Sequence, residues 1–486
     1  MMNESQKTLK AKFREKDFFV EKFKADVYAV GGYVRDLYRD VPAGEVDILI
    51  THHSVEDIIK KLKNHGKVDL VGKSFGVIKF SLKDKTYDIA LPRKDTPKES
   101  ELRSHKDFII STDPDIPIEK DLERRDFRCN SIALRLIDNK TIDPFCGFKD
   151  INAGVLRLTN PHAFPDDPLR VLRGARFASV LDFSLDPKIY EKAKEIDLKG
   201  LSVERVNEEF FKILLNSPRP SVGLEELFML GSLRQLFPEL YQLTLSIQDS
   251  VFHPEKDIFG HHTIWSHTKI TVDQAKRLAE HYNLKKSRTL ALLLAALFHD
   301  VGKPITAQWE FKKGRMVITN HGHDIAGEKI TEKTFDRFKI FSWNGFNLRK
   351  TVLPLIRCHH RASELWQNKE VITKKALNRL AADVNGEIEL IVYLDAADRA
   401  GRKEKPINRL DREAKWLLEK FEELNVSKET LKPLIMGRDL IKIGISPGLE
   451  MGKILKKLYH LQLDNVFDTT EEGLKMARKI IEKKPK

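Results

Sequence analysis

The stretch that decides the fold is Val27–Ile50, VYAVGGYVRDLYRDVPAGEVDILI. Its first four residues are apolar or aromatic and predict a buried strand, which Gly31 and Gly32 follow at once. Glycine lets the backbone come close to a ligand, and the next segment, Tyr33–Arg39, predicts a helix whose first amides favour a bound phosphate. The stretch therefore predicts a strand, a glycine turn and a helix arranged around an anion.

Two carboxylates lie two residues apart in the strand predicted next. Glu45 and Asp47 alternate there with Val46, Ile48 and Ile50, and the period of two along a strand sends both acids to one face. Acids about 6–7 Å apart on one face can bracket divalent metals, which sit about 4 Å apart in two-metal sites. The pair predicts a nucleotidyl-transfer site, and the alternative is a solvated acidic strand after a glycine turn.

Length and charge set outer limits on the organisation of the chain. A chain of 486 residues exceeds what one hydrophobic core usually serves, so several domains are expected. The formal net charge of +13 favours a polyanionic partner. Three cysteines are too few for a disulfide scaffold, and no apolar run reaches the roughly 18–20 residues that span a bilayer. We therefore expect a cytoplasmic protein without membrane contact, and the oligomeric state stays open.

The periodicity of apolar residues divides the chain. Val77–Leu82 and Tyr87–Leu91 predict a hairpin around Asp84-Lys85, and Ser131–Ile137 predicts a further strand. From about residue 160 the periodicity becomes helical and stays so. We expect a head at 1–158, a helical neck at 159–245, a histidine-rich helical block at 246–403 and a basic helical tail at 404–486.

Further polar residues of the head predict contacts to a nucleotide. Asp88 alternates with Tyr87 and Ile89, so it is either a third acid of the pair or a solvated strand residue. Asp126 is followed and preceded by arginines, whose planar forks suit phosphate, while Asp and Asn side chains suit ribose hydroxyls. The alternative is a surface cluster of ion pairs. This cluster contains Arg124, Arg125, Asp126, Arg128 and Asn130.

The segment DDPLRVLRGARF begins with a helix-start signal, with Asp167 as N-cap and Pro168 in the first turn. Asp167 and Arg170 are three residues apart and therefore neighbours at that start. An acceptor beside a donor matches the pairing edges of cytosine and adenine, whereas uracil and guanine would place donor against donor. A good bidentate base contact discriminates by about 1–3 kcal/mol. Arg173 and Arg176 either contact phosphate or pair with nearby acids.

Together these motifs resemble the class II tRNA nucleotidyltransferases, or CCA-adding enzymes, a family that also includes bacterial poly(A) polymerases. The resemblance covers nearly the whole chain, and two positions depart from it: Glu45 replaces the usual Asp, and Asp166 replaces a frequent Glu. The matching motifs are Gly31-Gly32-Tyr33-Val34-Arg35-Asp36, Glu45-Val46-Asp47, Arg124-Arg125-Asp126 with Asn130, Asp167-Pro168-Leu169-Arg170, and Glu204-Arg205 with Glu209.

The resemblance implies an α+β fold: a polymerase-β-like head with a mixed sheet, then an all-α neck, an HD domain and a helical tail. It implies addition of C, C and A from CTP and ATP to the tRNA 3′ end, by attack of the 3′-hydroxyl on the α-phosphate. Glu45 and Asp47 would hold Mg²⁺, and Asp88 is the third catalytic acid that we predict. The predicted nucleotide-binding residues are Gly31, Gly32, Arg35, Asp36, Arg124, Asp126, Asn130, Asp167, Arg170, Arg173 and Arg176.

Histidines and carboxylates recur through the third block. Such ligands from successive helices suit a divalent transition metal, and the pattern resembles an HD phosphohydrolase domain. The resemblance implies hydrolysis of phosphomonoesters or 2′,3′-cyclic phosphates. Which of His359 and His360 is a ligand stays open, and His253 is expected behind the ligands or in the wall of the site. The predicted metal ligands are His267, His299, Asp300, His323 and Asp398.

Three rival interpretations remain. Poly(A) polymerases tend to carry a second basic residue before the phenylalanine of the run Gly72-Lys73-Ser74-Phe75, and they usually lack an HD block. A partial enzyme that adds only CC or only A would differ in the loop Lys94–Asp107. A phosphohydrolase with an RNA-binding head would retain Glu45 without polymerisation.

The lysine-rich tail, including Lys453–Lys457 and Lys475–Lys486, either binds the phosphates of a nucleic acid or adds solubilising charge.

Overall fold

The computed structural model describes residues 9–71, 77–97, 108–312, 314–402, 406–423, 426 and 431–482. Residues 98–107 of the loop Lys94–Asp107 and the whole run Gly72–Phe75, on which two rival interpretations depend, lie outside the described residues. The chain divides into two compact units, Met1–Ser217 with Val222–Leu236 and Pro218–Ser221 with Phe237–Lys486.

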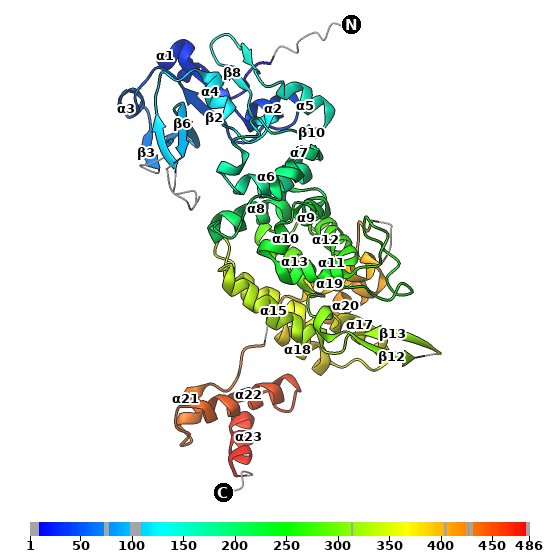
Figure 1. The fold of residues 1–486 in the computed structure, drawn as a ribbon. Coiled ribbons are helices and arrows are strands. Elements are labelled where there is room, and N and C mark those ends of the chain that lie inside the picture. Colours follow the sequence, from blue (N-terminus) through cyan, green and yellow to red (C-terminus); the bar gives the residue numbers. More distant parts are fainter. Residues whose placement is uncertain are drawn as a thin grey trace. The chain divides into compact units, whose positions relative to one another are not determined.

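The first unit is built on a mixed sheet, drawn in blue and cyan in Figure 1. Its strands are β1 (Val27–Val30), β2 (Asp47–Ile50), β3 (Lys67–Val71), β4 (Val77–Leu82), β5 (Lys85–Ala90), β8 (Ala133–Arg135) and β9 (Thr141–Ile142). The strand order is β3-β4-β5-β2-β1-β8-β9. β2 and β5 run parallel, whereas β1 runs antiparallel to both β2 and β8. The smaller pairs are β6 (Arg93–Pro97) with β7 (Phe108–Thr112) and β10 (Val155–Leu156) with β11 (Ser184–Leu185).

Helices of the first unit lie before, between and after the strands of the sheet. α2 (Gly32–Tyr38) directly follows β1, as predicted, and buries Tyr33 and Val34. α6 (Leu169–Leu181) packs on α8 (Val203–Asn216). Buried residues recur every three or four positions along both, which is the spacing of one helix face. The other helices are α1 (Lys16–Phe23), α3 (Val55–Leu62), α4 (Ile118–Glu123), α5 (Gly147–Ala153), α7 (Pro187–Ala193), α9 (Pro220–Met229) and α10 (Ser232–Leu236).

The second unit is mainly helical and surrounds a buried central helix, α13 (Lys286–Phe298). The continuous apolar run Leu290–Phe298 is fully buried, as predicted. The segment Lys286–Thr306 has the length and hydropathy of a membrane span, but 78% of its apolar window is buried inside the protein, which is typical of a core helix. Further helices are α11 (Pro238–Leu245), α12 (Ile264–His281), α14 (Lys303–Thr306), α15 (His323–Arg337), α16 (Leu348–Cys358), α17 (Arg361–Gln367), α18 (Lys374–Asp383), α19 (Ile388–Gly401) and α20 (Arg412–Glu423).

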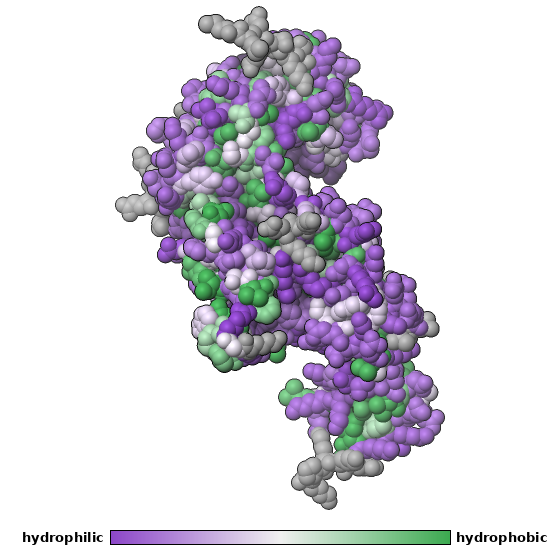
Figure 2. Space-filling view, turned by 90° about the vertical axis from the view of Figure 1, so that its right-hand side faces the viewer, coloured by the Kyte–Doolittle hydropathy of each residue, from purple (hydrophilic) through white to green (hydrophobic). Residues whose placement is uncertain are grey.

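The tail forms a small core of its own within the second unit. Its helices, drawn in orange and red in Figure 1, are α21 (Gly437–Ile441), α22 (Leu449–Leu463) and α23 (Thr470–Glu482). Ile435, Leu440, Leu458 and Phe467 are buried among them. The face shown in Figure 2 is mainly hydrophilic with scattered hydrophobic patches, as expected from a chain that is 32% charged.

The predicted α+β fold class is confirmed, and several boundaries need correction. The turn between β4 and β5 is Lys83-Asp84 rather than Asp84-Lys85, because Lys83 takes a positive φ of 57° and Lys85 already pairs with Leu82. The strand predicted at Ser131–Ile137 shortens to β8, since Ser131 still bonds back to a preceding 3-10 turn.

The histidine-rich block is not wholly helical. A hairpin of β12 (Gln308–Lys312) and β13 (Arg315–Thr319) interrupts it. Trp309 and Phe311 alternate with polar residues on β12, and Gly314 supplies a φ of +81° at the turn. This alternation with a period of two beside a glycine is a hairpin signal. The prediction that the periodicity stays helical from about residue 160 was therefore wrong here.

Candidate active sites

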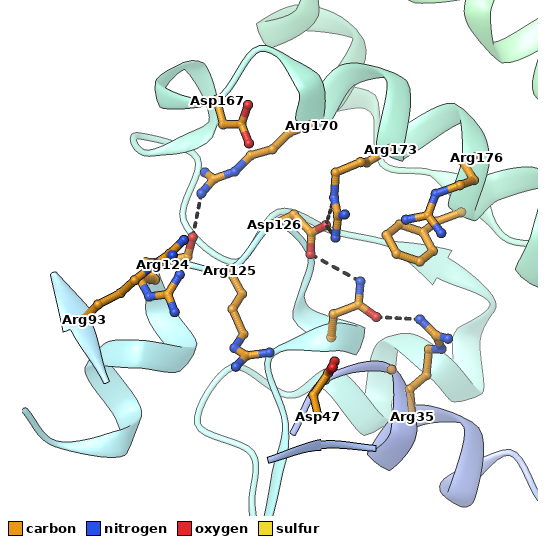
Figure 3. A pocket seen from close by; sticks show the side chains of 14 residues that line it. Arg35, Asp47, Arg93, Arg124, Arg125, Asp126, Asp167, Arg170, Arg173 and Arg176 are labelled. Carbon is orange, nitrogen blue, oxygen red and sulfur yellow. Dashed lines mark hydrogen bonds and ion pairs between the residues drawn. The ribbon is translucent and has the colours of Figure 1, made fainter. Parts of the chain in front are cut away.

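A pocket of about 460 Å³ opens in the first unit where β1 ends (Figure 3). Seven arginines and three aspartates line it, so the lining is strongly basic and suits a triphosphate. All the predicted nucleotide-binding residues except Asp36 are among its lining residues. The residues that line the pocket are Gly31, Gly32, Arg35, Asp47, Arg93, Arg124, Arg125, Asp126, Asn130, Asp167, Arg170, Arg173, Arg176 and Phe177.

Gly31 allows the turn and the close packing at the mouth of this pocket. Its φ is +72°, a region that favours glycine. A Cβ placed there would lie 3.0 Å from a terminal nitrogen of Arg125 and 3.7 Å from Asp47 Oδ2. A side chain at position 31 would therefore both strain the backbone and crowd two polar groups that line the pocket.

Asp126 holds two of the pocket's side chains in place. Its buried carboxylate accepts hydrogen bonds from Arg173 Nε at 2.7 Å and from Asn130 Nδ2 at 3.2 Å, and Asn130 Oδ1 in turn accepts one from Arg35 at 2.6 Å. Burial by itself raises the pKa of Asp126, but Arg173, the Phe127 amide and Asn130 outweigh it and lower the pKa to about 2. The carboxylate is therefore charged at neutral pH, and it holds Arg173 directly and Arg35 through Asn130.

The other predicted arginines pair elsewhere. Arg124 and Arg125 contact the fully buried Asp121 at 2.6 and 3.2 Å, and Arg128 donates to the Leu158 carbonyl at 3.2 Å. Arg124 and Arg125 pair with Asp121 rather than with Asp126, because Asp121 on α4 lies three and four residues before them. This i, i+3 and i, i+4 spacing is visible in the sequence.

Asp36 lies outside the pocket lining and pairs with Arg35, its oxygens 2.8 and 3.0 Å from two guanidinium nitrogens. Arg176 pairs with the buried Glu209 at 2.5 Å, so of the two roles predicted for it the structure shows the acid partner. The guanidinium of Arg176 also lies 3.9 Å from the centre of the Phe177 ring. Both arginines are thus preset by protein partners.

The start of α6 presents Asp167 and Arg170 at the opposite wall of the pocket. The N-cap of α6 is Pro168 rather than the predicted Asp167, whose carboxylate accepts from the Leu169 amide at 3.2 Å and pairs with Arg205 at 3.0 Å. Arg170 donates to the backbone carbonyls of Arg124 and Ala163. Acceptor and donor therefore stand side by side, each oriented by its own partner (Figure 3).

A second cavity of about 400 Å³ shares Asp47 with the first and collects the predicted acids. Asp47 pairs with Asp88 in the register of β2 and β5, and Glu45 lies just before β2 rather than within it. Burial raises the pKa of Asp47, as do the nearby charges of Asp88 and Glu45, while Arg125 lowers it. Such mutual repulsion favours a bound cation. The lining residues are Glu45, Asp47, Asp69, Lys79, Ser81, Thr86 and Asp88.

In the second unit, α12, α13 and α19 bring four predicted metal ligands together. His267 Nε2 lies 2.8 Å from Asp398, and His299 Nε2 lies 3.3 Å from Asp300 and 3.7 Å from Asp398. His299 donates through Nδ1 to the Ala296 carbonyl, so the Nε2 of the neutral ring carries a lone pair. This buried nitrogen has no hydrogen-bond partner among the described residues. A lone pair facing two carboxylates fits a cation between them.

Three further histidines lie beside these residues, and one of them, His323, is near Asp300. His323 Nε2 lies 3.5 Å from Asp300, 3.3 Å from His359 Nε2 and 3.1 Å from His360 Nε2. His323 and His359 both donate Nδ1–H to backbone carbonyls, which leaves their Nε2 atoms as acceptors that face each other. The structure thus groups His359 and His360 with His323 as a set that could hold a metal ion, and Asp300 lies near both His299 and His323.

Glu255 stands behind His267. Its Oε1 lies 3.0 Å from Nδ1 of both His253 and His267. Burial lowers the pKa of His267, but Asp398 and Glu255 outweigh it and raise the pKa to about 9, so the position attracts positive charge. His253 lies behind His267, as expected, whereas no sequence pattern singled out Glu255.

Comparison with known proteins agrees with this geometry. The family model of the poly A polymerase head domain matches residues 27–157. The model of the probable RNA and SrmB- binding site of polymerase A matches residues 182–243, and the HD domain model matches residues 264–399. The multifunctional CCA protein of Methylococcus capsulatus is 31% identical over 407 residues, which are 81% of this chain and 85% of the relative. The chain belongs to the multifunctional CCA protein family. A second such relative, from Mannheimia succiniciproducens, is 34% identical over 323 residues, 64% of this chain and 70% of its own.

Solved structures show the same fold. The CCA-adding enzyme of Bacillus stearothermophilus, solved in complex with CTP, has a TM-score of 0.58 at 20% identity and covers 95% of this chain and 96% of its own. The Thermotoga maritima enzyme, complexed with tRNA, has a TM-score of 0.53 at 20% identity and covers 96% and 95%. These neighbours share the fold, and the family models and relatives confirm the predicted family, with a nucleotidyltransferase head and an HD domain.

We expect Asp126→Asn to destabilise the first unit by about 2 kcal/mol at neutral pH. The pKa of Asp126 falls from an ordinary 3.8 to about 2, and each pKa unit is worth about 1.36 kcal/mol. Because the folded pKa is lowered, this stabilisation is complete above about pH 4 and is lost as the pH falls towards 2.

The measurement can separate the units, because all five tryptophans lie in the second. Urea unfolding followed by circular dichroism will show the loss, whereas the tryptophan fluorescence transition will stay in place. The difference between variant and unaltered chain will be equal at pH 7 and pH 5 and smaller at pH 3. A shift of the fluorescence transition, or a difference that persists unchanged at pH 3, would contradict the assigned role.

Proposed function

We propose that this chain adds C, C and A from CTP and ATP to the 3′ end of tRNA, and that its HD centre hydrolyses phosphomonoesters or 2′,3′-cyclic phosphates. The observation that carries the first activity is the position of Asp47, which lines both the arginine-rich pocket and the acidic cavity. A triphosphate bound by the arginines would then place its α-phosphate near the acids.

The side chains divide the work of transfer between the two cavities. Arg35 and Arg173, both held through Asp126, are preset to bind the triphosphate without reorganising. The tRNA 3′-oxygen forms a bond to the α-phosphorus, and the bond from that phosphorus to pyrophosphate breaks. Glu45, Asp47 and Asp88 fit two Mg²⁺ ions, which when bound lower the pKa of the attacking hydroxyl and stabilise the leaving pyrophosphate. Glu45 has the charge of the usual Asp and one methylene more.

Base selection would rest on Asp167 and Arg170. The amino groups of cytosine and adenine would donate to Asp167, and their ring nitrogens would accept from Arg170. Arg205 and the two carbonyls that bind Arg170 hold this pattern fixed. The chain therefore carries a template of protein side chains in place of nucleic acid.

We expect Asp167→Ala to lower the preference for CTP over UTP by about five- to 150-fold, the range for one bidentate base contact. Single-nucleotide incorporation rates on tRNA that lacks its CCA end, measured with each nucleotide, give the ratio. Asp166→Ala is the matched control, since this neighbouring acid does not line the pocket. An unchanged ratio in Asp167→Ala, or an equal loss in Asp166→Ala, would refute the template.

The same substrate separates the rival activities. Purified chain, Mg²⁺, tRNA without its CCA end, and labelled CTP and ATP should give three added nucleotides. A long A tract would instead identify a poly(A) polymerase, and one or two nucleotides a partial enzyme. No extension together with phosphate release that depends on Asp300 would leave only the phosphohydrolase.

The HD centre supports the second activity through its donor set. His267, His299, Asp300, His323 and Asp398 fit a divalent transition metal, and His359 and His360 add nitrogen donors. Such a metal, when bound, polarises a phosphoryl group and supplies hydroxide at neutral pH. Lys303 Nζ lies 2.6 Å from Asp300 and offers a cation for the substrate phosphate beside the ligands. Glu255 orients the His267 ring by its contact with Nδ1.

A further inference from the structure

A third cavity, in the second unit, combines aromatic and basic side chains. It has a volume of about 860 Å³ and is lined by α17, the 3-10 turn Lys369–Val371 that follows it, residues 409–411 and α20. Two tryptophans and five cationic side chains line it, together with three acids. It contains none of the residues that we assign to the transfer site or to the HD centre.

The two tryptophans are held in a fixed arrangement. The ring centres of Trp366 and Trp416 lie 5.3 Å apart with an angle of 77° between the planes, and both rings are half-buried. Ala414, Leu417 and Phe421 are buried and anchor α20. The stripe Arg412, Trp416 and Lys420, with its members four residues apart, faces the cavity. The cavity is thus lined by a cation, an indole and a second cation in sequence along one helix.

Positive charge in this cavity is only partly compensated. Among the residues that the structure describes, Lys369, Arg409, Arg412 and Lys415 form no ion pair with a carboxylate. Asp411, by contrast, is neutralised from behind by Arg399, whose nitrogen lies 2.8 Å from Oδ1. Lys369 Nζ lies 4.2 Å from the centre of the Trp366 ring. The Arg412 guanidinium also lies over this ring, 5.8 Å from its centre, so the cavity combines indole rings with cations that pair with no carboxylate among the described residues.

We propose that this cavity binds a nucleotide unit of single-stranded RNA, with the base on the tryptophans and the phosphate on Lys369, Arg409, Arg412 and Lys415. Indole faces stack any base, and nearby lysines and arginines bind the backbone, the combination typical of single-strand sites. A free nucleotide has the same chemistry, so the test must separate the two. This inference goes beyond the proposed function, because binding here requires neither nucleotidyl transfer nor hydrolysis.

The cavity lies close to the HD centre along the chain and in space. α17 begins immediately after His360, and Trp366 follows about 9 Å further along the helix axis. Arg399, which binds Asp411 at the cavity, is the neighbour of Asp398 on α19. A strand held on the tryptophans would therefore keep its end near the metal-binding residues.

Fluorine NMR of the full chain labelled with 5-fluorotryptophan tests the proposal at the site itself. Trp366→Phe, Trp416→Phe and Trp309→Phe assign three of the five signals. Titration with a hexamer of adenylate should move the signals of Trp366 and Trp416, and the signal of the exposed Trp309 should stay unchanged. Trp366→Ala should weaken the affinity read from the Trp416 signal by about five- to 150-fold, the range for one stacked base. Added salt should weaken it further.

The same titration has outcomes that overturn the proposal. If the hexamer raises the anisotropy of a labelled strand while both signals stay fixed, the RNA binds elsewhere. If no hexamer binds at all, the site does not exist. If AMP moves the signals and the hexamer does not, the cavity takes free nucleotides and the single-strand assignment is wrong. CCA addition measured on the same sample is independent, so its failure would count only against the transfer activity.

Discussion

Replacing Asp47 by Asn will slow nucleotide addition to tRNA on the order of a thousandfold while leaving CTP bound. The amide keeps the size of the side chain but removes the charge that joins the acidic cavity to the arginine-rich pocket. Losing part of a metal site costs several kcal/mol of transition-state stabilisation, and about 1.36 kcal/mol corresponds to tenfold in rate. Single-turnover rates on tRNA without its CCA end, and calorimetry with CTP, measure the two effects.

Asp69→Asn is the matched control. Asp69 lines the same acidic cavity from β3, but its carboxylate pairs with Lys67 at 2.7 Å and it belongs to no predicted ligand set. Its variant should keep a rate close to that of the unaltered chain. If Asp47→Asn lost less than about tenfold, or Asp69→Asn lost as much, the acids would not be the centre of transfer.

Replacing Asp300 by Asn will abolish phosphate release from the HD centre, again on the order of a thousandfold, and will leave CCA addition unchanged. Asp300 is 1% exposed and stands between His299 and His323, so its loss removes the charge that both donor sets share. A cation at such a site supplies several kcal/mol of catalysis. The measurements are hydrolysis of 2′,3′-cyclic AMP, bound metal by mass spectrometry, and transfer to tRNA in the same preparation.

His321→Ala serves as the control for this experiment. Its side chain is 74% exposed and contacts only Glu310 at 3.3 Å among the described ion pairs. The control should retain metal and hydrolysis, and tryptophan fluorescence should show that Asp300→Asn still folds. Full hydrolysis by a folded Asp300→Asn variant would remove the HD centre from the reaction, and parallel loss of CCA addition would show that the two activities are not separate.

The sequence predicted those parts of the transfer site that local spacing controls. Gly31 and Asp47 are read from one strand–turn–helix segment, and both line the pocket. Arg93 also lines it but was missed, because it lies on β6 and only the tertiary fold brings it there, whereas Phe177 was missed although it directly follows the predicted Arg176 on α6. Asp121 was missed although its spacing of three and four residues to Arg124 and Arg125 was visible in the sequence.

The HD centre shows the same limit. Its motif residues were predicted as a set, but their tautomers were not. In His299, His323 and His359, Nδ1 donates to a backbone carbonyl three residues earlier in the chain, which leaves Nε2 facing the site. The contact of Glu255 with His267 joins a loop to α12, and no periodicity predicts it. Contacts between elements are set by packing, which one sequence without its structure does not reveal.

The parallel register of β2 and β5 also limits how this protein can change. Asp47 and Asp88 stand opposite each other only because the hydrogen bonds of the two strands are in phase. A slip by one residue would turn Asp88 to the reverse side of the sheet and put Ile89, which is now wholly buried, in its place. Deleting one residue within β5 should therefore abolish transfer with every acid still present, because the site depends on the alignment of two backbones as much as on its side chains.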